Sequence, residues 1–242
     1  MDGSIVVILF AAVFVGAIIH GISGFAFGII VLMVLPHFFT YSDSLALISF
    51  TTVCVLGYNA YLYRRHINWQ EIPLALAVFV IADFFAVRLL KYVGENPIWH
   101  LLLGGIFILM AAYLIWGQER FKILPTKTNA VIFNGVGGVI NGLFCVGGPI
   151  TAMYFLAVSK SKEEYLGTTQ MLFFINITID FLLRALNGMV SKPILIYGVS
   201  SLWCIVLGLL VGKKLFDKIN ALTLRRIICG LMVLNGVVML LK

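Results

Sequence analysis

The segment NGLFCVGGPI, residues 141–150, decides the fold because it places a loop-like composition inside a membrane-like stretch. It lies within residues 128–159, which contain no Asp, Glu, Lys or Arg. An uncharged run of this length is typical of a transmembrane segment. The quoted residues nevertheless include three glycines and a proline, which interrupt helices. Irregular backbone at membrane depth is tolerated only where it is buried in protein or lines a watery cavity. The segment therefore predicts a broken helix beside such a cavity.

The composition of the chain is that of an integral membrane protein. Of its 242 residues, 62% are hydrophobic and 11% are charged, and the mean hydropathy is +1.07. A soluble domain has about 25% charged residues. Several uncharged runs reach the ~20 residues that a helix needs to cross the hydrocarbon core, and the alternating ten-residue strands of a membrane barrel are not seen. We predict an all-α, polytopic membrane bundle, with uncharged runs at residues 4–42, 44–63, 72–82, 96–118, 128–159, 165–179, 193–212 and 227–241.

Charge and cysteine content argue against several classes of protein. The net charge of +7 is explained by Lys and Arg in short loops, where these residues set the orientation of the spans, so we expect no nucleic-acid partner. The four cysteines, Cys54, Cys145, Cys204 and Cys229, show no CxxC spacing, so neither a zinc site nor a disulfide framework is indicated. We expect no metal and no cofactor. Cys145 differs from the other three because it lies in the broken segment.

The sequence contains an internal repeat with an offset of 121 residues. VGAIIHGISGFAFGI, residues 15–29, aligns with VGGVINGLFCVGGPI, residues 136–150. In this register His20 falls on Asn141, and each aligned piece lies in a long uncharged run. The alignment therefore predicts a second broken helix near residue 24.

A second pair of segments extends the repeat along the chain. Residues 88–105 align with residues 213–230 at an offset of 125, and the difference of four residues fits a loop insertion. Matches in the same order and at regular spacing are the signature of a duplicated unit. We predict a first membrane repeat at residues 1–120 and a second at residues 121–242, which together form one membrane domain.

The loop charges distinguish between two topologies for the broken segments. If each segment crosses the membrane once, the 17 Lys and Arg residues divide into nine on one side and eight on the other. If each is a hairpin or makes two short crossings, they divide into twelve and five, and only this topology obeys the positive-inside rule. Each repeat is then a glycine-broken helical hairpin plus three transmembrane helices. The repeats are inverted relative to each other, both termini lie outside, and the architecture is that of a transporter.

The second broken segment is predicted to start a short helix at Gly147, Gly148 and Pro149. Proline suits the first helical turn because it needs no N–H partner, and glycine lets the backbone approach a ligand closely. Free N–H groups at a helix start attract anions. We therefore predict an anion site at this break, and close helix packing is the alternative role of its glycines.

Three pieces of the sequence carry a resemblance to a known family. They are GISGFAFGIIVLMVLP (residues 21–36), YLYRRHINW (61–69) and NGLFCVGGPITAMYFLAVSKSKEEYLGTTQMLFF (141–174). In this order they resemble the sulfite exporter TauE/SafE family of integral membrane anion permeases. The resemblance implies transport of small sulfur-containing anions such as sulfite, sulfoacetate or thiosulfate-like ions, coupled to protons, in the inner (plasma) membrane of a prokaryote.

Candidate substrate-binding residues cluster at the two breaks. His20, aligned with Asn141, can hydrogen-bond an oxyanion and can carry a proton near neutral pH; a packing role is the alternative. Other polar groups at the breaks can donate to a ligand or cap the broken helices. Residues 168–170 either line the cavity or bond to their own helix. The predicted set is His20, Gly21, Ser23, Gly24, Asn141, Gly142, Cys145, Gly147, Gly148, Pro149, Thr168, Thr169 and Gln170.

Charged residues inside the spans form the second group of candidates. Asp83 lies in the third span, where an acid is costly and faces a cavity or a partner, so Asp83 and His20 are the proton-coupling candidates. Asp180 and Arg184 have the i, i+4 spacing of residues that pair on one helix face. We predict that they form a structural ion pair, and attraction of the anion by Arg184 is the alternative.

Together these features predict a secondary transporter for small anions that works by alternating access. Its expected partners are a small anionic substrate and the lipid bilayer, and self-association into a homo-oligomer stays open. The alternatives are a non-transporting membrane partner or scaffold subunit, a channel, or a transporter of another class of small solute. An intramembrane enzyme is disfavoured because the chain has no HExxH, GxSxG or paired-aspartate motif.

Overall fold

Apolar helices make up the described structure, as the composition predicts. The computed structural model describes residues 3–93, 98–112, 116, 123–216, 226, 230, 233 and 237. Within these residues there is no strand. The α-helices are α1 (Gly3–Ser23), α2 (Phe27–Val34), α3 (Tyr41–Leu62), α4 (Ile72–Val93), α5 (Ile98–Ala112), α6 (Lys127–Phe144), α7 (Gly148–Val158), α8 (Lys162–Leu186) and α9 (Lys192–Phe216), with short 3-10 helices η1 (Leu35–His37) and η2 (Arg64–His66).

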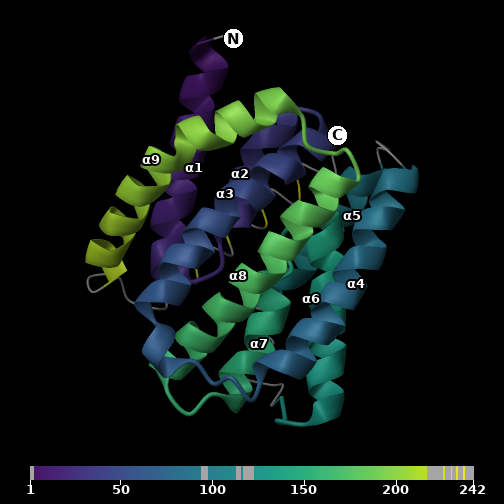
Figure 1. Cartoon of the computed structure of the whole chain (residues 1–242), viewed down its shortest axis with the longest axis vertical. Coiled ribbons are helices and arrows are strands. Elements are labelled where there is room, and N and C mark those ends of the chain that lie inside the picture. The colour runs from purple at the N-terminus through teal and green to yellow at the C-terminus, as the bar shows by residue number, and fades with distance from the viewer. Residues whose placement is uncertain are drawn as a thin grey trace.

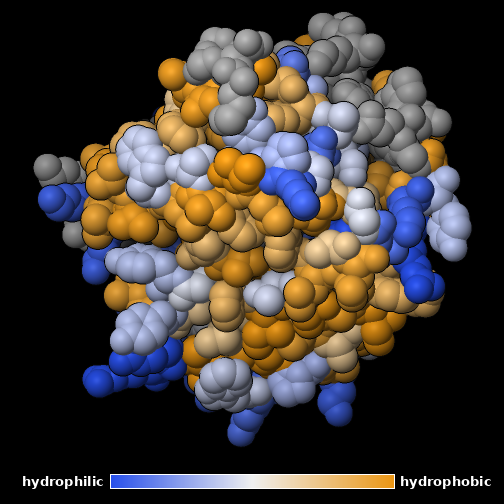
Figure 2. All heavy atoms as spheres, turned by 45° about the horizontal axis from the view of Figure 1, so that its top comes forward, coloured by the Kyte–Doolittle hydropathy of each residue, from blue (hydrophilic) through white to orange (hydrophobic). Residues whose placement is uncertain are grey.

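Five helices in the described part of the chain are long and apolar enough to cross a membrane: Ile5–Ile22, Tyr41–Leu62, Ile72–Val93, Glu163–Leu186 and Lys192–Leu215. Large apolar side chains are exposed on the outer faces of α4, α6 and α9. Figure 2 shows broad hydrophobic areas on this face, with hydrophilic groups at its edges and in its upper part. Exposed apolar surface of this extent is expected where a bundle contacts lipid, so the chain is a helical membrane bundle.

The helices pack as a central pair flanked by two outer groups. α3 packs against α8, α1 packs against α9, and α4 packs against α6; Figure 1 shows α1 and α9 on the left and α4, α5 and α6 on the right. Glycines allow the close outer contacts. Gly208 of α9 lies against Ala17 of α1, and Gly138 of α6 lies against the backbone of Phe79 on α4. A side chain at either glycine would separate the helices.

The helix boundaries recur with the offset of the sequence repeat. α1 ends at Ser23 and α6 at Phe144, 121 residues later. The same offset separates the starts of α2 and α7, and the starts of α3 and α8. The contacts recur too, because α1 packs against α9 as α6 packs against α4. Equivalent segments of the two halves therefore fold alike.

The central helices α3 and α8 begin with equivalent caps and run in opposite directions. Thr40 accepts a hydrogen bond from the N–H of Asp43, and Ser161 accepts one from the N–H of Glu164, the caps that side-chain oxygens provide at helix starts. Just beyond the end of α3, the Asn68 amide donates to Glu164 at the start of α8, over 2.8 Å. Beyond the end of α8, Ser191 donates to Asp43 at the start of α3.

Both broken segments fold back as helical hairpins. α2 packs against α1, and α7 packs against α6. Gly16 of α1 lies beside Phe27 and Val31 of α2, and Gly137 of α6 lies beside Thr151 of α7. In each broken segment the short helix therefore packs back against the longer helix that precedes it.

Candidate functional site

The turns of the two hairpins each contain a residue with a positive φ, and each turn lies against the start of the other short helix. Gly24 has φ = 81° and Cys145 has φ = 56°, the left-handed conformation that ends a helix. The N–H of Cys145 closes α6 by donating to the Asn141 carbonyl, over 2.6 Å. Gly28, just after the first turn, lies against the Cys145 carbonyl, so only a residue without a side chain fits there. The start of each short helix is therefore next to the turn of the other half.

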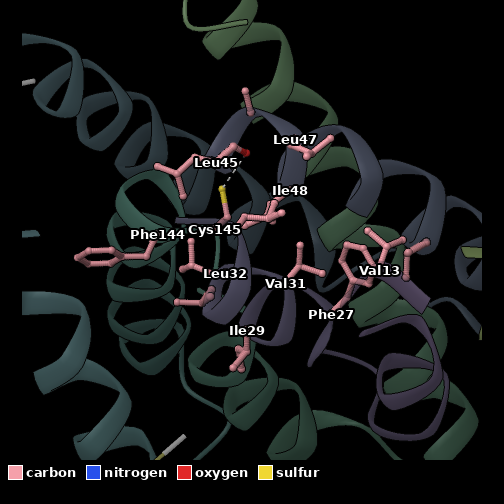
Figure 3. Packing of buried hydrophobic residues seen from close by; sticks show 14 of the residues in the cluster. Val13, Phe27, Ile29, Val31, Leu32, Leu45, Leu47, Ile48, Phe144 and Cys145 are labelled. Atoms are coloured by element: carbon pink, nitrogen blue, oxygen red, sulfur yellow. Dashed lines mark hydrogen bonds between the residues drawn. The ribbon is translucent and has the colours of Figure 1, made fainter. Parts of the chain in front are cut away.

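Cys145 joins the second turn to the core between the two halves. Figure 3 shows its sulfur directed at the Leu45 carbonyl of α3, at 3.8 Å, with Ile48 and Leu32 around it. The Ser49 hydroxyl lies 3.4 Å from the same sulfur. The side chain is 8% exposed, so the left-handed turn is fixed by packing on both sides.

A small cavity of about 40 Å³ lies between the two turns. Phe27 and Gly28 at the start of α2, and Gly148 at the start of α7, line one part of it. Three of its lining residues have a buried polar atom without a hydrogen-bond partner in the described structure: His20 (Nδ1), Thr52 (Oγ1) and Asn176 (Oδ1). We call this space the central cavity.

The surroundings of the central cavity suit a small anion. Neither short helix has a side-chain cap, since the residues before them are Ala26 and Gly147. The first N–H groups of a helix have no partner within it, and they carry the positive end of the helix dipole. Two helix starts that meet at one cavity therefore provide a positive potential without a charged side chain.

A second space, which we call the vestibule, also has His20 in its lining. Its volume is about 30 Å³, and its lining includes His20, Gly24, Asn59, Gln170 and Lys213. The Gln170 amide is central to it. Gln170 donates from Nε2 to the Gly24 carbonyl, and its Oε1 lies 3.3 Å from Nε2 of His20 and 3.4 Å from Nδ2 of Asn59.

Asp180 and Arg184 on α8 form a fully buried ion pair. Nη2 of Arg184 lies 2.9 Å from Oδ1 of Asp180, and both side chains are 0% exposed. Arg184 also donates to the Gly142 carbonyl, and Ser49 donates to Asp180. The pair therefore joins α8 to α3 and to the end of α6, and neither partner lines the two cavities.

Asp83 is a second buried acid with a different environment. It lies on α4, is 0% exposed, and accepts a hydrogen bond from the Asn141 amide over 2.8 Å. Its other oxygen, Oδ2, has no hydrogen-bond partner among the described residues. Asn141 lines the central cavity, so Asp83 is one hydrogen bond away from it. Within the described residues no group of three or more His, Cys, Asp or Glu is arranged to hold a metal ion.

The family model described as sulfite exporter TauE/SafE matches residues 8–239, nearly the whole chain. The chain belongs to the sulfite exporter TauE/SafE family. Membership confirms the resemblance seen in the sequence, and it makes the chain an integral membrane anion transporter rather than an enzyme. Comparisons with curated proteins and with solved structures give no match.

The structure of this TauE/SafE chain brings about half of the predicted residues to the two cavities. The central cavity is lined by His20, Asn141, Cys145 and Gly148 of the predicted set. The vestibule is lined by His20, Gly21, Gly24 and Gln170. His20 lines both, which agrees with its predicted position at the first break.

Other predicted residues do not line either cavity and instead make contacts within the protein. Thr168 accepts from the N–H of Asn68, and Thr169 donates to its own helix at the Tyr165 carbonyl, as in the alternative given for residues 168–170. Two predicted glycines, Gly142 and Gly147, pack against backbone, and Pro149 is a buried residue in the first turn of α7, as its sequence position predicts. Ser23 ends α1, and its side chain lies outside the described residues.

Four polar residues at the cavities were missed by the sequence analysis. Thr52 and Asn176 line the central cavity, and Asn59 and Lys213 line the vestibule. The signal for Asn59 and Asn176 was an amide within an apolar span, which is costly unless it is paired or functional. In the sequence Lys213 looks like any other basic residue near the end of a span. Only the packing of α9 against α1 places it at a cavity.

Proposed function

We propose that this TauE/SafE protein is a secondary transporter that moves a small sulfur oxyanion or organosulfonate through the central cavity. The main observation is that three residues that line one cavity, His20, Thr52 and Asn176, each have a buried polar atom with no hydrogen-bond partner among the described residues. More than about 90% of buried polar groups in proteins are hydrogen-bonded. Three such atoms around one space are explained by a polar ligand that binds there.

The chemistry of these groups fits an oxyanion. The Thr52 hydroxyl can donate, and rotation of the Asn176 amide exchanges its oxygen for its NH₂ group. Nε2 of His20 donates to Oε1 of Gln170, so Nδ1 donates to an anion when the imidazole is protonated. The two helix starts add positive potential. The cavity of about 40 Å³ is far below the ~300–1,000 Å³ of sites for drug-sized ligands. In this conformation it therefore favours an ion of a few heavy atoms.

The proposed mechanism is alternating access between two inverted repeats. The shared helix boundaries, the equivalent contacts of α1 with α9 and α6 with α4, and the opposite directions of α3 and α8 support it. Transporters of this kind bind the substrate where the repeats meet, at broken helices. We place the protein in the inner membrane of a prokaryote, with both termini outside.

Coupling to protons would use His20 and Asp83. His20 lines both cavities, and histidine changes its charge near physiological pH. Asp83 reaches the central cavity through Asn141. Binding of an anion next to these groups favours their protonated forms, so a proton would move with the anion.

A thermal-shift panel on purified protein tests the function. Sulfite, thiosulfate, sulfate, taurine, sulfoacetate, acetate and chloride are added at two pH values. A ligand at 100 times its dissociation constant stabilises the folded state by about 2.7 kcal/mol, so one or more sulfur anions should raise the unfolding temperature. No shift with any anion would contradict the proposal and favour a scaffold subunit or another solute.

The variant Gly148→Leu locates the binding site. Gly148 lines the central cavity, and a larger side chain there would fill it. The variant should lose the anion-dependent shift. Gly105→Leu is the matched control, because a side chain at Gly105 meets no atom within 4 Å, and it should keep the shift. Equal shifts in both variants would place the anion elsewhere.

A further inference from the structure

We propose that the vestibule is an entry site for the transported anion and that Gln170 is the gate between it and the central cavity. This inference rests on the proposed transport function. It adds Asn59 and Lys213 to the residues that act on the substrate, and it assigns Gln170 a role in access.

The first argument is that Gln170 lines the vestibule and contacts His20, the residue that lines both spaces. His20 lines both the central cavity and the vestibule. Gln170 is 1% exposed, and its amide holds the Gly24 carbonyl of the first turn, with His20 and Asn59 beside its oxygen. An anion that passes from one space to the other has to separate these contacts.

The second argument is the character of the vestibule. Its lining includes one cationic residue, Lys213, and the two amide residues Asn59 and Gln170. Tyr58 and Leu62, which also line it, are 41% and 40% exposed. The vestibule is therefore next to the outer surface at the ends of α3 and α9. A cation at such a mouth raises the local concentration of anions.

The third argument comes from the equivalent positions at the second turn. With the offset of 121, Gln170 corresponds to Ser49, and Gly24 corresponds to Cys145, which Ser49 contacts. Asn59 corresponds to Asp180, the partner of Arg184. The first turn is therefore held by neutral groups beside a vestibule, and the second by a fully buried ion pair. Hydrogen bonds between neutral groups are weaker than those to charged groups, so the first turn is the one that opens from this conformation.

Cysteine labelling at Leu62→Cys tests the entry site without the need for a transported anion. The modification rates of this cysteine by an anionic and by a neutral methanethiosulfonate reagent are read by peptide mass spectrometry. Lys213→Gln should lower the ratio of the anionic to the neutral rate by about two- to fivefold, the range expected for one exposed charge pair. Lys214→Gln, a change at the adjacent exposed lysine, is the matched control and should keep the ratio. Equal effects of the two variants would overturn the entry site.

Labelling of the native Cys145 tests the gate. Cys145 lines the central cavity, so a reagent that enters through the vestibule reaches it only past Gln170. Gln170→Ala should speed its modification by at least threefold, and Asn59→Ala, a milder change, should speed it less. Thr178→Ala on the same helix, where the hydroxyl bonds to its own backbone, should leave the rate unchanged. Rates at Cys145 that do not respond to Gln170→Ala and Asn59→Ala would overturn the gate.

The two sets of experiments fail independently. If the anion panel shows no binding but labelling responds as described, the path exists and the proposed substrate class is wrong. If anions bind but labelling does not respond to Lys213, Gln170 or Asn59, the central site stands and the entry path is wrong.

Discussion

Gly24 and Cys145 lie at equivalent positions of the two hairpin turns, 121 residues apart, and both have a left-handed backbone. Glycine adopts this conformation without steric cost. For an L-residue with a side chain the cost is roughly 1–2 kcal/mol. The second turn therefore keeps a strained residue where the first turn has glycine, and the sulfur of that residue contacts Leu45 and Ser49.

Because Cys145 is strained, we expect its glycine variant to be more stable than its alanine variant, the opposite of the order found within a regular helix. Both Cys145→Gly and Cys145→Ala remove the thiol, but only glycine relieves the backbone. We expect Cys145→Gly to be more stable than Cys145→Ala by about 1 kcal/mol, measured by thermal or denaturant unfolding in detergent. The matched control is Cys204, a buried cysteine in the regular helix α9. There glycine should be less stable than alanine by about 0.5–1 kcal/mol. The same order at both positions would contradict the strain.

The adjacent glycines of the second turn should respond differently to alanine. A side chain at Gly147 would collide with the Gly137 carbonyl, whereas one at Gly148 would meet Phe25 at 3.5 Å, an ordinary contact. Overpacking of a tight site costs about 1–3 kcal/mol, so Gly147→Ala should lower the unfolding temperature clearly. Gly148→Ala should stay close to the wild type. If Gly148→Ala is as destabilised as Gly147→Ala, the hairpin packing described here is wrong.

The membrane class, the two breaks and the register of the repeat could be predicted from the sequence because each depends on local composition. Uncharged runs, glycines and proline act within one segment, so the ends of α1 and α6 could be placed near residues 24 and 145. The split of positive charge favoured a hairpin or a double crossing over a single crossing, and in the structure each short helix packs back on the helix before it.

The lining of the cavities could be predicted only in part, because it depends on which faces of distant helices meet. His20 and Asn141 were found since they flank the breaks. Thr168 and Thr169 are polar and close in sequence to Gln170, yet a helix turns each residue by about 100°, and only Gln170 faces the vestibule. Lys213 could not be found, since its role depends on the contact of α9 with α1.

The buried ion pair predicts a large effect of removing one charge. Arg184→Met would leave Asp180 buried without its cation, and breaking a buried pair costs about 3–5 kcal/mol. The double variant Asp180→Leu with Arg184→Met should recover part of this loss, because it removes both charges. Arg88→Met is the control, since Arg88 is exposed and lies over the Phe84 ring, and it should change stability by less than about 1 kcal/mol. The free energy of unfolding in detergent is measured for the wild type and the three variants. A small effect of Arg184→Met would show that water reaches the pair.

The last prediction concerns the proton. Asp83→Asn keeps the shape of the side chain, and its oxygen can still accept from the Asn141 amide, but it can no longer carry a proton. We expect this variant to bind the anion and to exchange it between two sides of a liposome membrane, while a pH gradient no longer drives its accumulation. The measurement is anion uptake into proteoliposomes with and without the gradient. Glu163→Gln, at an exposed position in the first turn of α8, should keep the full response to the gradient. If Asp83→Asn also kept the full response to the pH gradient, Asp83 would not be the proton carrier, and His20 would be tested next.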